Sequence, residues 1–140
     1  MSREVPPRQV IYESPSEIFA TDAGGSFFFP LGERGRRGRV DCRPYDEVRF
    51  VVSIWHPSSR RSIDLDKAYA EIRGAFDPDD EHWVRLAEVE PVVPPYAAGD
   101  AFDGWLVLPV LGAHGAFALY GSGFEPRARV QVRASAYFVP

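Results

Sequence analysis

Apolar and polar positions alternate with a two-residue period along the last stretch of the chain, Arg127 to Val139. Because a strand sends successive side chains to opposite faces, this pattern predicts one long strand with a buried face and a solvated face. Such a strand needs a sheet to lie in and a second layer over its apolar side. The predicted inward positions are Ala128, Val130, Val132, Ala134, Ala136 and Phe138.

The same period recurs upstream, between Tyr45 and Trp55. Shorter strands are predicted at Ala68–Phe76, His82–Val89, Trp105–Leu111 and Ala116–Tyr120. The segment from Pro91 to Tyr96 holds three prolines, so it is predicted to be a crossover or an edge rather than a central strand. In the Tyr45–Trp55 strand, Val48, Phe50, Val52 and Ile54 are predicted to point inward, and Arg49, Val51, Ser53 and Trp55 outward.

Composition supports many short strands joined by turns. The 140 residues include 13 prolines and 12 glycines, and 14% of them are aromatic. A chain of this length forms a single core. We therefore predict an all-β fold, an antiparallel β-sandwich of jelly-roll type, over residues 32–140.

Residues 1–31 are interpreted as an extended N-terminal arm. Gln9–Tyr12 is predicted to be a short strand, Ser14–Phe19 a turn or a single helical turn, and Ser26–Phe29 an apolar strand that ends before Pro30. Three successive phenylalanines, Phe27, Phe28 and Phe29, cannot share one face of a strand. The arm is therefore predicted to pack either on its own sandwich or on another subunit.

Charge and cysteine content narrow the function classes. The formal net charge of -4 disfavours a general nucleic-acid binder. The sequence shows neither an apolar run long enough to span a bilayer nor an N-terminal hydrophobic signal core. Cys42 is the single cysteine, interpreted as a buried filler. Together these features predict a cytoplasmic protein without a membrane span.

The candidate metal and catalytic patterns are incomplete. Asp77–Glu81 supplies several oxygen ligands of the kind calcium prefers, but it lacks the glycine and spacing of an EF-hand, and aspartates are common in turns. The three histidines have no zinc-ligand spacing. Ser122 lies between two glycines but outside a full Gly-x-Ser-x-Gly motif, and the arginines of Gly32–Arg39 are interpreted as a solvated hairpin tip. We expect no metal, no cofactor and no enzymatic activity.

One hairpin carries a family resemblance. The stretch from Glu71 through Asp77 to Trp83–Leu86 resembles a hairpin of the galactose-binding-like jelly rolls, which include discoidin-type domains and many carbohydrate-binding modules. The resemblance extends over Val40–Val139. The usual Asp-Gly turn is replaced by Asp77-Pro78-Asp79-Asp80, and no sugar-binding motif matches. The resemblance implies a sandwich whose end loops bind sugars, lipids or proteins.

Two functions follow as hypotheses. The first is a structural subunit of a homo-oligomer or larger protein assembly, because aromatic and arginine side chains are enriched at interfaces. Its predicted contacts are Phe27, Phe28, Phe29, Arg127, Arg129 and Arg133. The alternative is a carbohydrate-binding module that recognises a glycan through end loops near Trp55, with His56, Arg60 and Arg61 beside it. Trp83 and Trp105 are predicted to be core residues.

Overall fold

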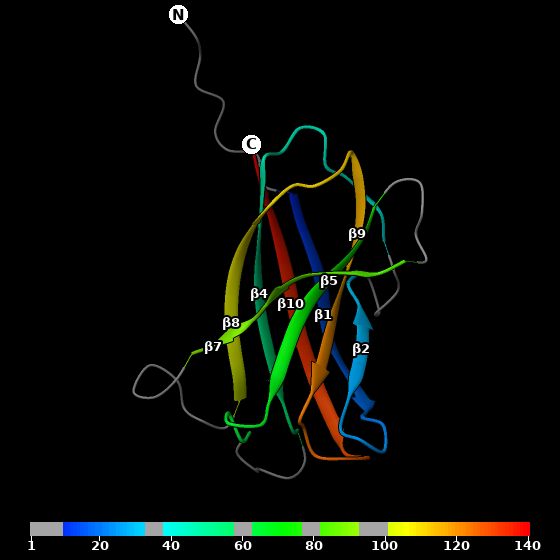
Figure 1. Ribbon diagram of the computed structural model, residues 1–140, viewed down its shortest axis with the longest axis vertical. Coiled ribbons are helices and arrows are strands. Elements are labelled where there is room, and N and C mark those ends of the chain that lie inside the picture. Colours follow the sequence, from blue (N-terminus) through cyan, green and yellow to red (C-terminus); the bar gives the residue numbers. More distant parts are fainter. Residues whose placement is uncertain (1–9, 33–37, 58–62, 77–81, 93–100) are drawn as a thin grey trace, which may run out of the picture.

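The computed structural model describes residues 10–32, 38–57, 63–76, 82–92 and 101–140, and in these ranges it consists of two antiparallel sheets (Figure 1). The first sheet has the order β1-β10-β4-β8-β7, and the second has the order β2-β9-β5-β6 with β3 also paired to β9. The strands are β1 Val10–Ala20, β2 Phe27–Pro30, β3 Val40–Asp41, β4 Glu47–Trp55, β5 Tyr69–Phe76, β6 Val84–Glu88, β7 Glu90–Pro91, β8 Ala101–Pro109, β9 His114–Ser122 and β10 Arg129–Val139.

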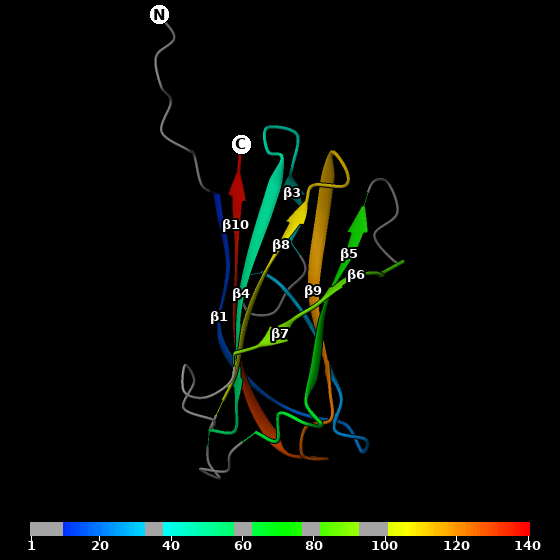
Figure 2. The same cartoon turned by 60° about the vertical axis from the view of Figure 1, so that its left-hand side comes forward.

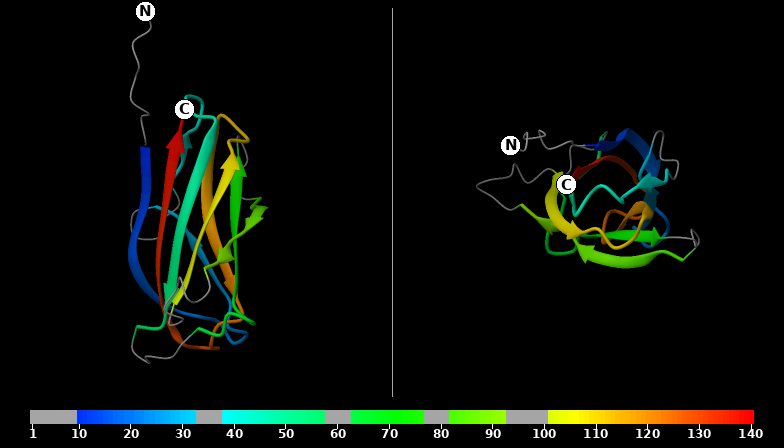
Figure 3. Two further views of the ribbon diagram at one scale, coloured as in Figure 1. Left: turned by 90° about the vertical axis from the view of Figure 1, so that its left-hand side faces the viewer. Right: turned by 90° about the horizontal axis from the view of Figure 1, so that it is seen from above.

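The pairing is nested, which makes the sandwich a jelly roll. Strand β1 pairs with β10, β2 with β9, β4 with β8 and β5 with β6, all antiparallel. A long hairpin folded over itself gives this order, because each outer pair encloses the next pair inward. The predicted antiparallel β-sandwich is therefore confirmed, and Figure 3 shows its two layers from the side and from above.

The core lies between the facing sheets and follows the predicted alternation. Phe50 of β4 and Phe138 of β10 are fully buried, and both lie near Phe117 of β9, with ring centroids 5.2 and 6.0 Å apart. Strand β10 is paired on both sides, so its backbone is satisfied while its apolar face meets the second sheet. Aromatic packing across the layers thus joins the sheets.

Within the N-terminal segment, the described residues 10–30 contribute one strand to each sheet. Strand β1 is the edge of the first sheet and continues through the stretch expected to turn, with only a register shift between Ser14 and Glu17. The prediction of a turn or helical turn at Ser14–Phe19 is wrong, because pairing with β10 overrides the local signal of Pro15. In β2, Phe27 and Phe29 are buried in the core, whereas Phe28 is 41% exposed.

Pro91 begins the segment predicted to be a crossover or an edge, and it lies in an edge strand; residues 93–96 of that segment lie outside the described residues, and the chain changes sheet at Val89, before Pro91. Strand β6 pairs with β5 in the second sheet, and β7 pairs with β8 at the edge of the first (Figure 2). Pro91 therefore lies in an edge strand, where its missing N–H costs no central hydrogen bond. The predicted hairpin of β5 and β6 is also present, although the acidic turn Asp77–Glu81 lies outside the described residues.

Adjacent phenylalanines of β2 give a test of this arrangement. We predict that Phe27→Ala lowers the free energy of unfolding by about 3–5 kcal/mol, because it leaves a cavity beside Phe124. The matched variant Phe28→Ala, on the opposite face of the same strand, should cost about 1 kcal/mol or less. Urea unfolding followed by tryptophan fluorescence measures both. Equal losses for the two variants would contradict the burial of Phe27.

Candidate functional site

The outer face of the first sheet carries a patch of exposed apolar side chains. Val51 of β4 and Trp105 of β8 are direct cross-strand neighbours, and they are 50% and 64% exposed. Val107, two residues further along β8, is 43% exposed. In a monomer, each of these side chains would leave apolar surface in water at the centre of a sheet. We call Val51, Trp105 and Val107 the apolar patch; contiguous exposed apolar surface of this kind marks interaction sites.

Charged residues surround the apolar patch in register. Arg49 is opposite Val107, and Asp103 is opposite Ser53, so a cation lies toward one end of the patch and an anion toward the other. Arg49 is exposed and donates from Nε to Glu47 Oε2 at 2.9 Å. The guanidinium group has further N–H donors that this single bond does not use.

The predicted arginine stripe is divided in the structure. Arg129 and Arg133 are exposed residues of β10, on the same face as the apolar patch and one strand further from β8 than β4. Arg127 precedes the strand and has a φ of 50°, so it does not continue the stripe. Two of the three arginines therefore share a face with Trp105, whereas Phe27 and Phe29 lie in the core and Phe28 lies on the second sheet.

The tryptophans differ from expectation. Trp105, predicted to be a core residue, is exposed, and it has the largest exposed fraction of the exposed large apolar side chains in the described part of the chain. Trp55 and Trp83 are each half-buried, and Trp83 packs edge-on against Phe28 with ring centroids 5.2 Å apart. The alternation within β8 explains the error: Phe102 and Leu106 are buried, which places Trp105 on the other face.

A cavity opens at the end of the sandwich between the segment after β4 and the turn from β9 to β10. Its volume is about 480 Å³, and its described lining residues include His56, which the sequence singled out, together with Asp64, Lys67, Phe124 and Glu125. His56 is only 8% exposed. Arg60 and Arg61, predicted to act with it, lie outside the described residues. The cavity was not predictable, because its walls come from segments far apart in the sequence.

The outer face of the second sheet has a different character, because its charged groups contact one another. Glu71 is 5% exposed and accepts hydrogen bonds from the Tyr69 hydroxyl at 2.9 Å and from Arg73 Nε at 3.0 Å. Arg85 lies 3.8 Å from the same carboxylate, and Arg73 stacks over the Tyr120 ring at 4.1 Å. This cluster is internally satisfied and serves the stability of the sheet.

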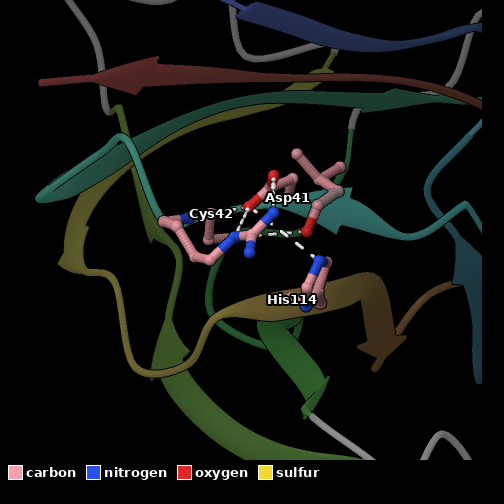
Figure 4. A network of polar contacts seen from close by, with 5 residues as sticks. Asp41, Cys42 and His114 are labelled. Carbon is pink, nitrogen blue, oxygen red and sulfur yellow. Dashed lines mark hydrogen bonds and ion pairs between the residues drawn. The ribbon is translucent and has the colours of Figure 1, made fainter.

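A second polar cluster lies where β3 meets β9 (Figure 4). Arg43 donates from its guanidinium and from its backbone N–H to the Asp41 carboxylate, and His114 Nε2 lies 3.9 Å from it. The hydrogen bonds from Arg43 hold the pKa of Asp41 well below its usual range. Cys42, between them in sequence, is buried, as predicted. Among the described residues, no group of three or more His, Cys, Asp or Glu side chains is arranged to hold a metal ion.

Residues missed by the sequence reasoning are Val51 and Val107 as members of a surface patch, and Asp103 as its acidic neighbour. Val51 was placed outward but received no role. The burial alternates from Phe102 to Val107 and places Asp103, Trp105 and Val107 on one face, but the sequence gives only a weak signal of it, because Trp105, Leu106 and Val107 are all apolar. No helix within the described ranges has the length and apolar character of a membrane span.

Comparison with known proteins gives fold neighbours alone. The chain matches no protein-family model and no curated protein. Solved structures that resemble it include the acidic stable capsid of Helicobacter pylori bacteriophage KHP30 (9% identity, TM-score 0.41, 95% of this chain and 94% of that chain). Another is Eiger TNF from S. frugiperda (10% identity, TM-score 0.47, 97% of this chain and 94% of that chain). A third is the C-terminal domain of EclA, a sugar-binding protein (10% identity, TM-score 0.42, 94% of this chain and 78% of that chain).

At such identities and TM-scores these likenesses carry no inference about function. The jelly-roll fold rests on the nested strand pairing of this chain itself. Membership of the galactose-binding-like group stays a prediction, and the jelly-roll part of that resemblance is confirmed.

The partial burial of Tyr69 predicts a pH effect on stability. Burial raises the pKa of Tyr69 in the folded state above its usual value. Because the folded protein holds this proton more tightly, the associated stability is fully present below about pH 10 and is lost as the pH rises through the folded-state pKa. Urea unfolding between pH 8 and 11.5 should therefore show that the free energy of unfolding falls more steeply with rising pH for the parent protein than for Tyr69→Phe. Identical slopes would contradict the assignment.

Proposed function

We propose that this protein is a non-catalytic assembly module in which two copies dock through the outer face of the first sheet. The observation that carries the proposal is the exposed Trp105 at 64%, set directly beside Val51 at 50%. Burying apolar area contributes about 25 cal/mol per Å², and an exposed tryptophan is a side chain often found at the energetic centre of interfaces. A sheet of another chain packed on this face would bury the apolar side chains that a single chain leaves exposed.

The register of β4 and β8 favours a second copy as the partner. Because Val51 is opposite Trp105, a twofold axis that lies in the plane of the interface and runs along the strands between these residues exchanges β4 with β8. Trp105 of one copy then lies over Val51 of the other, and the reverse contact forms at the same time. Closed twofold contacts of this kind are the commonest arrangement of protein oligomers.

The same operation also pairs the charged positions beside the apolar patch. Arg49 is two residues before Val51 and opposite Val107, and Asp103 is two residues before Trp105 and opposite Ser53. Because an axis along the strands keeps each position along them, Arg49 of one copy lies over Val107 of the other, and Asp103 lies over Ser53. No like charges of these residues are therefore brought together. The exposed Arg129 and Arg133 lie on the same face, and Arg133 is opposite Ser53.

A carbohydrate-binding module is the second candidate. The observation that favours it is the cavity of about 480 Å³ at the end of the sandwich, to which His56 contributes. Ligand pockets usually have volumes of about 300–1,000 Å³. This function would use the end loops beside Trp55 and leave the sheet face for assembly.

Substitution at the centre of the patch tests the dimer. We predict that Trp105→Glu raises the dimer dissociation constant by more than about thirtyfold, because it removes the largest apolar contact and buries a charge. The matched control is Val84→Glu, which changes an exposed residue of similar exposure, 56%, on the second sheet. Sedimentation velocity over a concentration series measures both. Equal effects would show that the face of Trp105 has no special part in association.

A further inference from the structure

The cavity at the end of the sandwich is built from fixed backbone as well as side chains. Gly123 lines it with a φ of 76°, and a side chain at this position would overlap the carbonyl oxygen of Lys67. The Lys67 and Ala68 backbone N–H groups both donate to the Asp64 carbonyl oxygen, at 3.1 and 2.8 Å. The segment from Asp64 to Ala68 and the turn between β9 and β10 are therefore in close contact, and both line the cavity.

His56 has one ring nitrogen that forms no hydrogen bond with the described residues. Its Nδ1 lies 3.0 Å from the carbonyl oxygen of Arg129, and because a carbonyl only accepts, Nδ1 donates this hydrogen bond. In the neutral ring, Nε2 is then an acceptor. No hydrogen bond joins Nε2 to the described residues, where every fully buried side-chain nitrogen or oxygen has a partner. Nε2 thus keeps accessible surface, and His56 is a wall of the cavity.

The remaining lining fits a neutral ligand with many hydroxyl groups. Ile63 and Phe124 are 6% and 5% exposed and give an apolar floor, and Phe124 is fixed by packing against Phe27 and Phe102. Around it are two carboxylates, Asp64 and Glu125, and the ammonium group of Lys67. The carboxylates disfavour an anion. Acceptors and a donor around an apolar floor suit hydroxyl groups on a small ring.

We infer that this cavity is a binding site for one neutral sugar or similar polyol unit, in which a ligand hydroxyl donates to His56 Nε2. The inference rests on the second candidate function and adds to it the position of the site and the ligand class. The apolar side of the ring would pack on the floor formed by Ile63 and Phe124. Ligand hydroxyls would donate to the carboxylates of the rim and accept from Lys67.

The experiment is a titration of the isotope-labelled full chain with glucose, galactose, mannose and glycerol, followed by amide chemical shifts in NMR spectra at neutral pH. Sodium phosphate is titrated as an anionic probe. The expected result is a saturable shift with at least one sugar, largest at His56, Lys67 and Phe124. The amide chemical shifts of the residues around Trp105 should not change.

Two variants separate the hydrogen bond from the fold. His56→Asn keeps an amide N–H at the position from which Nδ1 donates to Arg129 and removes Nε2. It should weaken sugar binding by about tenfold with an unchanged amide spectrum elsewhere. Trp105→Ala, on the sheet face, should leave sugar affinity unchanged.

Each alternative result of these titrations would contradict a different part of the proposal. Sugar-dependent shifts confined to the face around Trp55 and Trp105 would overturn the cavity site and leave carbohydrate binding in place. Phosphate binding in the cavity without sugar binding would overturn the ligand class. Absence of shifts with all the sugars would overturn both the site and the second candidate function. Full sugar affinity in a folded His56→Asn protein would overturn the role of Nε2.

Discussion

The structure depends on the double pairing of β10, whose backbone is hydrogen-bonded to β1 on one side and to β4 on the other while its apolar face meets the second sheet. This constraint fixes which face of the first sheet is inside. A shift of one residue would send Phe138 and Val132 into solvent and Arg133 into the core. The nested pairs of the jelly roll then follow from the order in which the chain returns to each sheet.

The same constraint leaves the outer faces of the two sheets in different states. On the second sheet, Glu71, Arg73 and Tyr69 contact one another, and the buried carboxylate is stabilised by its own neighbours. On the first sheet, Trp105 and Val51 face outward, and no second layer formed by the described residues covers them. The sandwich is therefore complete as a fold but has one face whose apolar area would be better buried. That asymmetry is the physical ground for proposing assembly.

Local periodicity was sufficient to predict the long strands, because the alternation in Arg127–Val139 and Tyr45–Trp55 records burial directly. Local periodicity failed for the N-terminal segment, where pairing partners far along the chain decide the structure: Phe27 is opposite Gly121, and Val10 is opposite Phe138. The prediction of a core position for Trp105 is wrong because the apolar run from Trp105 to Leu108 carries no alternation from which the face of the strand can be read. His56 follows Trp55 in the sequence and is a candidate for that reason, but the cavity itself arises from long-range packing that no local pattern reveals.

The most direct test of assembly is the solution mass of the unmodified protein by light scattering across a wide concentration range. The account predicts a mass that rises from the 15.7 kDa of one chain toward twice that value as concentration increases. A mass that stays at 15.7 kDa up to millimolar concentration would contradict the proposal that the face around Trp105 docks on a second copy.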